Sequence, residues 1–382
     1  MNRFLTPARP PGLVIFVAVV AGFGSLMGAS SAFAKPAPPS GTSGASFQGL
    51  GQMPGVVIQP GSCGTQALGI SGDGSVIAGA GCVSSASNEA FRWTAAGGYQ
   101  RLGDLGGGSS DARAASFDGS VVVGQSADAS GTPRAYRWTA AQGMVALPLL
   151  PLGQEADAVT DDGTMAAGGN AWWKTSGQTG NFGNCGDAQI SLAMADLSAD
   201  GSVAAGSGPH GTPFMGDFFN AYRSTPAGNC QDIDPVGNRN SDAGGISADG
   251  QVIVGEAQVG GPYLAFRWTA STGMVNLGDL GGGLSRADAA NRDGSVVVGD
   301  SLTSGSTGSA HAFVWTARCG MLDLQTVLKN QGAKIPSGWI LQIATDVSED
   351  GTVITGWGIS PHVPGSKFGQ TEPWRAVLPA PC

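Results

Sequence analysis

Charged side chains are scarce in this chain, and cationic ones are the scarcer of the two signs. Only 12% of the 382 residues are charged, and 19 Lys and Arg face 28 Asp and Glu, for a formal net charge of −9. Nucleic-acid binding needs a basic face that neutralises phosphates. This charge balance therefore excludes nucleic acid as an expected partner.

The motifs of common catalytic and cofactor sites are also missing. There are three histidines, His210, His311 and His362, and there is no HExxH or CxxC spacing for a metal. No Gly-x-Ser-x-Gly elbow of a serine hydrolase occurs. Residues 206–211 fit Gly-x-Gly-x-x-Gly, but no strand–helix–strand unit surrounds them. We expect no cofactor, no metal and no catalytic residue, with a three-histidine metal site as the weaker alternative.

Helical periodicity is lacking as well, whereas glycine is abundant and a short frame repeats seven times. The 64 glycines follow no period of three, so they are expected in the turns between many short strands. Each copy of the frame has Asp-Gly, a small polar residue two positions before the Asp, and a glycine six positions after it. The seven aspartates, which we predict to be structural turn residues, are Asp73, Asp118, Asp162, Asp200, Asp249, Asp293 and Asp350.

The second unit shows how one repeat divides into strands. Residues 112–116, 120–124, 135–139 and 144–147 read as four short strands, and Asp118-Gly119 joins the first two as a tight turn. Four strands in about 45 residues correspond to one blade of a β-propeller. The sequence thus predicts an all-β fold with seven four-stranded blades, and a β-solenoid is the alternative.

The two ends of the repeat region are offset by one strand. The last unit stops after its third strand at residues 374–378, and Ser46–Gly51 resembles the fourth strand at Gly98–Gly103. Pairing the first strand of the mature chain with the last blade would close the ring and remove its open edge. We therefore predict one propeller domain over residues 46–382.

Aromatic residues mark every third strand and are expected to fill the gaps between blades. The assigned set is Phe91, Tyr136, Trp172, Tyr222, Phe266, Phe313 and Trp374. Strand alternation places Trp93, Trp138, Trp268 and Trp315 on the same face. A stripe of this kind is far more often core than a ligand platform.

The N-terminal 34 residues read as a cleaved export signal. Arg3 and Arg9 precede an apolar stretch, and the small-x-small pattern at residues 32–34 predicts cleavage after Ala34. A flexible linker is expected at residues 35–45. An uncleaved membrane anchor is the alternative. The product is predicted to be secreted or periplasmic, with no transmembrane segment after cleavage.

Six cysteines fit such an oxidising compartment. Cys63 and Cys82 flank the first Asp-Gly turn at similar distances, so they are the best disulfide candidate. Cys185, Cys230, Cys319 and Cys382 allow further pairings that the spacing leaves open.

Three motifs resemble the HAF-repeat extracellular proteins of bacteria. Residues 309–316 contain His311-Ala312-Phe313, and residues 90–94 and 265–269 are close variants of this first motif. The second, Leu-Gly-Asp-Leu-Gly-Gly, occurs at 102–107 and 277–282, and the third, Asp-Gly-Ser-Val-Val-Val-Gly, at 118–124 and 293–299. The resemblance spans about residues 46–378 and is weaker in the third, fourth and seventh units, where Lys174, Ser224 and Ala376 replace the Trp. It implies an exported repeat protein and adds no catalytic residues.

Function is expected on the face opposite the Asp-Gly turns. The loops between second and third strands vary most in length, and such loops commonly carry recognition. Carboxylates near that face are the candidate ligand-binding residues, with solvated turn residues as the alternative: Asp104, Asp111, Asp157, Asp242, Asp279 and Asp288.

We expect a non-catalytic exported protein that binds an extracellular or envelope protein or glycan. The alternative is an envelope or extracellular hydrolase or lyase at the central channel. That alternative requires ionisable residues with perturbed pKa values at one channel mouth.

Overall fold

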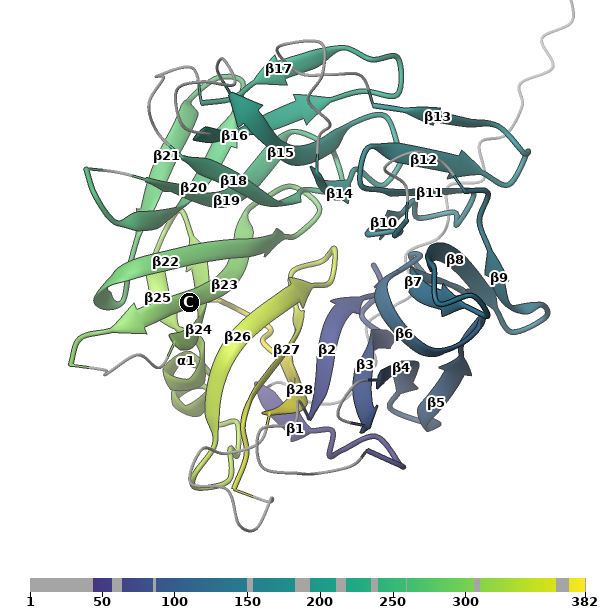
Figure 1. The fold of residues 1–382 in the computed structure, drawn as a ribbon. Helices are drawn as coiled ribbons and strands as arrows, with labels where there is room; N and C mark the ends of the chain where they lie inside the picture. Colours follow the sequence, from purple (N-terminus) through teal and green to yellow (C-terminus); the bar gives the residue numbers. More distant parts are fainter. Residues whose placement is uncertain are drawn as a thin grey trace, which may run out of the picture. The chain divides into compact units, whose positions relative to one another are not determined.

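The structure, a computed structural model, is a ring of seven four-stranded antiparallel sheets (Figure 1). It describes residues 44–56, 64–84, 87–149, 154–182, 193–210, 218–234, 240–258, 260–305, 310–361 and 371–381. The prediction of a seven-bladed β-propeller is confirmed, and the closed ring excludes the β-solenoid. The predicted signal peptide at residues 1–34 lies outside the described residues.

Every blade runs from an inner strand beside the propeller axis to an outer strand at the rim. The inner strands are β2 (Thr65–Ile70), β6 (Gly106–Ala115), β10 (Ala158–Val159), β14 (Ala193–Leu197), β18 (Ser241–Ile246), β22 (Gly281–Ala290) and β26 (Ile340–Val347). The second strands are β3 (Val76–Ser84), β7 (Val121–Asp128), β11 (Met165–Gly168), β15 (Ala204–His210), β19 (Val252–Gln258), β23 (Val296–Thr303) and β27 (Val353–Ile359).

The third strands are β4 (Ser87–Thr94), β8 (Pro133–Thr139), β12 (Ala171–Lys174), β16 (Phe218–Ser224), β20 (Tyr263–Thr269), β24 (Ala310–Thr316) and β28 (Thr371–Val377). The outer strands are β5 (Gly98–Gly103), β9 (Gly143–Ala146), β13 (Thr179–Asn181), β17 (Cys230–Asp232), β21 (Gly273–Gly278), β25 (Gly320–Asp323) and, for the seventh blade, β1 (Ser46–Gly49).

The ring is closed by an exchange between the two ends of the propeller. β1 pairs antiparallel with β28, with Ser46 opposite Val377 and Gly49 opposite Trp374. The predicted offset of the termini is therefore confirmed. Ala45, which was expected to end the flexible linker, is buried in the core cluster of this last blade.

The seven Asp-Gly turns share one hydrogen-bond pattern. In the first blade the Asp73 carboxylate accepts the Ser75 amide at 2.9 Å, and the Ser71 hydroxyl accepts the Val76 amide at 2.9 Å. Gly74 has a φ of 71°, a left-handed conformation in which a side chain would be strained. These bonds satisfy turn amides that have no ladder partner. We call the end of the propeller that carries these turns the turn face, and the opposite end the loop face.

The glycine six residues after each Asp is explained by a close backbone approach. A Cβ on Gly255 would lie 1.9 Å from the Asp242 carbonyl oxygen of the neighbouring inner strand. The equivalent carbonyl blocks the same position in five more blades, at Gly79, Gly124, Gly168, Gly299 and Gly356. Only glycine lets the second strand pair this closely with the inner strand.

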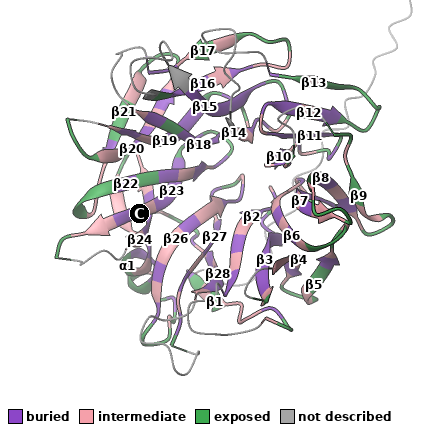
Figure 2. Cartoon of the chain, in the orientation of Figure 1, coloured by how far each residue is buried: buried purple, intermediate pink, exposed green. Residues whose placement is uncertain are grey.

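The hydrophobic core lies between blades rather than within them. One cluster joins Ala78 of the first blade to Val122 and Tyr136 of the second, and another joins Val254 of the fifth blade to Phe313 of the sixth. Figure 2 shows the same distribution: β3, β7, β19 and β23 begin with runs of buried residues, and the outer strand β9 ends exposed. Apolar burial between neighbouring sheets therefore stabilises the ring.

The register of the third blade differs from the prediction. Gly168 pairs with Ala171 and Ala166 with Trp173, whereas in the second blade Gly124 pairs with Tyr136. Ala171, and not Trp172, thus occupies the position of Tyr136, and Trp173, which is 2% exposed, occupies the repeated tryptophan position. Lys174 consequently does not replace a tryptophan. The reason is that the connection between β11 and β12 has only two residues. The third strand of this blade therefore begins one residue earlier in the sequence than predicted.

One short helix interrupts the repeat. α1 (Leu324–Asn330) follows β25 and begins at Asp323, whose carboxylate accepts the Thr326 amide at 2.6 Å. Its Leu324, Val327 and Leu328 are buried, one turn apart, in the cluster that contains Trp339. The helix was not predicted, and it fills the space between the sixth and seventh blades.

Candidate functional site

A β-bulge recurs on the inner strands at the same place in the frame. In six blades the pairing with the second strand shifts by one residue, five positions before the turn Asp. The extra residues are Leu68, Arg113, Ala195, Gly244, Asp288 and Thr345. A bulge redirects the side chain of its extra residue. Two of these residues are charged, and each forms ion pairs at the loop-face end of the channel, the space that the inner strands surround.

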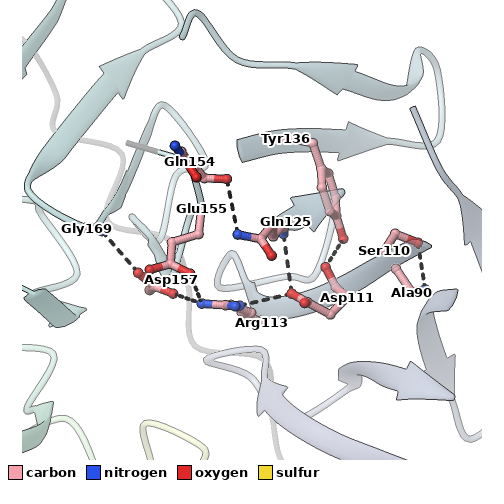
Figure 3. Close-up of polar contacts among 10 residues, drawn as sticks. All are labelled: Ala90, Ser110, Asp111, Arg113, Gln125, Tyr136, Gln154, Glu155, Asp157 and Gly169. Carbon is pink, nitrogen blue, oxygen red and sulfur yellow. Dashed lines mark hydrogen bonds and ion pairs between the residues drawn. The ribbon is translucent and has the colours of Figure 1, made fainter. Parts of the chain in front are cut away.

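Arg113 gathers three carboxylates from two blades (Figure 3). Its Nε lies 2.9 Å from Asp111 Oδ1, and its Nη1 lies 2.8 Å from Glu155 Oε2 and also contacts Asp157 Oδ1. Asp157 further accepts the Gly169 amide at 3.2 Å, and Asp111 accepts the Gln125 amide at 3.3 Å. We call Arg113, Asp111, Glu155 and Asp157 the Arg113 cluster. It joins the second and third blades.

A second cluster joins the fifth and sixth blades. Arg286 Nε lies 2.9 Å from Asp288 Oδ1, and its Nη2 lies 3.3 Å from Asp300 Oδ1. Glu256 and Asp242 interact electrostatically with the same guanidinium. These five residues form the Arg286 cluster. One oxygen of Asp288, Oδ2, is fully buried and has no hydrogen-bond partner.

The two clusters are related by the repeat, with the charges exchanged. Asp111-Ala112-Arg113 and Arg286-Ala287-Asp288 occupy the same frame positions on β6 and β22. In each, one arginine faces more carboxylates than it can neutralise: three in the Arg113 cluster and four in the Arg286 cluster. The loop-face end of the channel is therefore negatively charged on two sides.

Two further carboxylates lie deeper, toward the turn face. Asp346 Oδ2 accepts the Ile70 amide of the next blade at 2.8 Å, and Asp346 Oδ1 accepts the Val347 amide at 2.7 Å. Asp196 accepts the Ile246 and Leu197 amides in the same way, at 3.2 and 2.7 Å. Both residues stand four positions before a turn Asp. Each carboxylate ties the edge of its own inner strand to that of the next blade.

Burial raises the pKa values of the channel carboxylates. Burial, only partly offset by Arg286, raises the pKa of Asp288 to about 8. Burial, with a smaller contribution from the charge of Asp196, raises the pKa of Asp346 to about 7. The pKa values of Asp157 and Asp196 rise to about 6, again chiefly through burial. The channel thus holds protons that exposed carboxyl groups would have lost.

These shifts predict that stability falls as the pH rises from about 5 to about 8. A carboxyl whose folded-state pKa is raised binds its proton more tightly in the folded state, so the stability it contributes is lost as the pH passes that pKa. For Asp346 alone the loss is on the order of 3 kcal/mol. Urea unfolding at the two pH values measures it.

The turn aspartates act in a different pH range. Burial raises the pKa of Asp162, but hydrogen bonds from the Thr164 amide and from the Thr160 and Thr164 hydroxyls outweigh it and hold this pKa below its usual value. The stability that Asp162 contributes is therefore lost only at a pH below the one at which an exposed aspartate takes up its proton. A free energy of unfolding that is constant or rises from about pH 5 to about pH 8 would contradict the assignment of the channel carboxylates.

The six predicted ligand-binding residues separate into three groups. Asp104 and Asp279 are turn residues: each accepts two glycine amides, at 2.6 and 3.0 Å for Asp104 and at 2.5 and 3.0 Å for Asp279. Asp111 and Asp157 belong to the Arg113 cluster, and Asp242 and Asp288 belong to the Arg286 cluster. Whether any of the six binds a ligand stays a prediction.

The arginines and the deeper carboxylates were not predicted from the sequence. Arg113 and Arg286 stand two residues from a predicted Asp, so the Asp-Ala-Arg and Arg-Ala-Asp triplets at equivalent frame positions were the available signal. Glu155 aligns with Asp111 in the frame. Asp196 and Asp346 replace Ala or Gly at a shared frame position.

Other predicted site features are placed as follows. His311 Nδ1 lies 2.7 Å from Asp323 Oδ2 beside α1, and His311 pairs with Ser301, the residue after Asp300 of the Arg286 cluster. No group of three or more His, Cys, Asp or Glu among the described residues could hold a metal ion. Cys82 is buried on β3, but Cys63 lies outside the described residues, so their disulfide stays a prediction. No helix in the described part of the chain is long and apolar enough to span a membrane.

Comparison with solved structures supports the fold. The oligogalacturonate lyase from Vibrio parahaemolyticus has a TM-score of 0.54 and 11% identity, over 87% of this chain and 93% of that chain. The β-propeller domain of the Trilobed protease from Pyrococcus furiosus has a TM-score of 0.54 and 10% identity, over 81% of this chain and 94% of that chain. An oligogalacturonate lyase in complex with manganese has a TM-score of 0.50 and 12% identity, over 88% and 97%.

No protein-family model matches the chain, and no curated protein is similar to it in sequence. Likeness at these identities shows architecture and not activity. The chain is a seven-bladed β-propeller protein with two arginine-centred carboxylate clusters on its inner strands.

Proposed function

We propose that the chain is an exported, non-catalytic propeller protein that binds a cationic extracellular or envelope ligand at the loop face. The observation that carries the proposal is the excess of carboxylates over arginine in both clusters. A cationic group, such as a basic peptide side chain or an amino sugar, would relieve the mutual repulsion of these carboxylates. The overall charge of −9 favours the same class of ligand.

The Arg286 cluster is the stronger of the two binding candidates. In the Arg113 cluster, Asp157 is bonded to both Arg113 and the Gly169 amide, and all three carboxylates pair with the arginine. In the Arg286 cluster, Asp288 Oδ2 has no partner, and burial together with Asp242 and Asp300 raises the pKa of Glu256. Glu256 is therefore the carboxylate that would gain most from a cation.

A hydrolase or lyase at the channel is the second candidate, and one observation favours it. Asp288 keeps a proton near neutral pH, and a carboxyl with a raised pKa is the usual general acid. Ion-pair networks that serve structure also shift pKa values. We therefore rank binding above catalysis.

Export rests on the predicted signal peptide at residues 1–34 and on the resemblance to HAF-repeat proteins. Secretion or residence in the periplasm would supply the oxidising conditions for the predicted Cys63–Cys82 disulfide. The same resemblance supports a partner outside the cytoplasm, either a protein or a glycan.

An array of basic, neutral and acidic peptides and glycans tests the proposal. We expect the chain from residue 35 onward to retain basic members, and retention to fall steeply with salt because the contacts are ionic. Equal retention of neutral and acidic members would contradict a cationic ligand. Turnover of an arrayed glycan by the wild type, lost in Asp288→Asn, would establish the enzyme instead.

A further inference from the structure

The turn face carries a ring of backbone hydrogen bonds that links all seven blades. An amide beside each Asp-Gly turn donates to the equivalent carbonyl of the next blade. The bonds are Asp73 N to Phe117 O, Phe117 N to Asp161 O, Asp161 N to Ala199 O, Ala199 N to Ala248 O, Asp249 N to Arg292 O, Arg292 N to Glu349 O and Glu349 N to Gly72 O, at 2.9 to 3.1 Å.

Three charged side chains of this ring cross the channel. Arg292 Nη2 contacts Glu349 Oε2 and lies 3.4 Å from Asp161 Oδ2. Both carboxyls therefore approach the same guanidinium nitrogen, Nη2. Asp161 belongs to the third blade and Arg292 to the sixth, nearly opposite in a ring of seven. The triad therefore ties the third blade to the sixth and seventh blades, with which it shares no hydrogen bond of the ring.

Packing holds the triad in place. Glu349 is 12% exposed at its side chain, and a Cβ on Gly72 would lie 2.6 Å from Phe117 Cδ2 and 3.2 Å from Glu349 Cδ. The charged groups that act on Glu349 are Asp161 and Arg292, and the neighbouring ring residues of the first, second, fourth and fifth blades are Gly72, Phe117, Ala199 and Ala248. Asp73 and Asp249, whose amides also donate in the ring, direct their carboxylates to the Ser75 and Gln251 amides of their own turns, at 2.9 Å.

We propose that Asp161, Arg292 and Glu349 form a pH-sensitive latch that closes the turn-face end of the channel. With Glu349 protonated, Arg292 faces one negative charge and contacts both carboxyl groups. With Glu349 ionised, the two carboxylates repel each other and compete for one guanidinium nitrogen. Because each side chain belongs to a ring residue, the loss of the latch loosens the ring.

The pKa of Glu349 fits this role. Burial, followed by the hydrogen bond and the negative charge of Asp161, raises the pKa of Glu349 to about 7. The latch is thus closed in mild acid and opens as the pH rises through neutrality.

Amide hydrogen exchange at the ring tests the proposal. From about pH 6 to about pH 8.5, after correction for intrinsic base catalysis, we expect the protection of the Glu349 and Arg292 amides to fall about tenfold. The Ala199 amide, which bonds Ala248 in the same ring but lies away from the triad, is the matched control and should keep its protection.

Two variants distinguish a pH-sensitive latch from a contact that closes the channel at every pH. In Glu349→Gln the amide stays neutral and can still donate to Asp161, so the fall in protection should disappear. If this variant does not fold, Asp161→Asn should give the same result. An equal fall at Ala199, no fall in the wild type, or an unchanged fall in the variants would overturn the proposal.

Discussion

A chain that begins at Gly51 should unfold far more easily than one that begins at Gly44, because it lacks the strand that closes the ring. β1 pairs with β28 over four residues, and Phe47 packs edge-on against Trp339 with ring centroids 5.1 Å apart. Its loss leaves the edge of β28 open and exposes part of the last core cluster. We expect the free energy of unfolding to fall by about 3 kcal/mol or more.

Urea unfolding and light scattering of the two chains measure this effect. The chain from Gly44 keeps Ala45 and β1, so it is the matched control and should behave like the full mature chain. The open edge of β28 should also make the shorter chain associate. Equal stability of the two chains would show that β1 does not close the seventh blade.

Replacing Arg113 should be nearly as damaging as removing β1. In Arg113→Met three carboxylates lose their common cation, and Asp157, whose side chain is 13% exposed, is left buried with an uncompensated charge. Breaking a buried ion pair on one side costs about 3 kcal/mol. At about pH 5 the loss should be smaller, because the pKa of Asp157 is already raised to about 6 and rises further without the arginine.

Arg101→Met is the control for this variant. Arg101 pairs with Glu89 and its side chain is 49% exposed, so its removal should cost less than about 1 kcal/mol. Urea unfolding of both variants at about pH 5 and about pH 7 gives the four losses in the free energy of unfolding that are compared. A pH-independent loss in Arg113→Met would show that the residue contributes by packing and not by neutralising Asp157.

The architecture was predictable because the repeat carries it. Each Asp-Gly turn marks one inner hairpin, the number of turns equals the number of blades, and the offset ends indicate closure. The third blade shows where this fails. Trp172 and Trp173 are adjacent, and only the two-residue connection before them decides which one faces the next blade. α1 was missed because seven residues with three apolar positions give little periodicity.

The candidate site was predictable only in part. Four of the six predicted carboxylates lie in the two clusters. They were predictable because the distance of a residue from its turn Asp in the repeat tells whether it lies near the loop face. The partners were not predictable in the same way. Arg113 reaches Glu155 across a blade boundary, 42 residues along the chain, from a bulge that the sequence pattern does not reveal. Contacts between blades depend on side-chain direction, which strand alternation does not give at a bulge.

Calorimetric titration of a basic ligand from the array into two single variants tests the proposed site most directly. Glu256→Gln removes a carboxylate of the Arg286 cluster, and Asp249→Asn removes one from the turn face of the same blade. The account predicts a loss of affinity of about tenfold or more in Glu256→Gln and no change in Asp249→Asn. Equal losses in both variants, or none in Glu256→Gln, would contradict binding at the loop-face end of the channel.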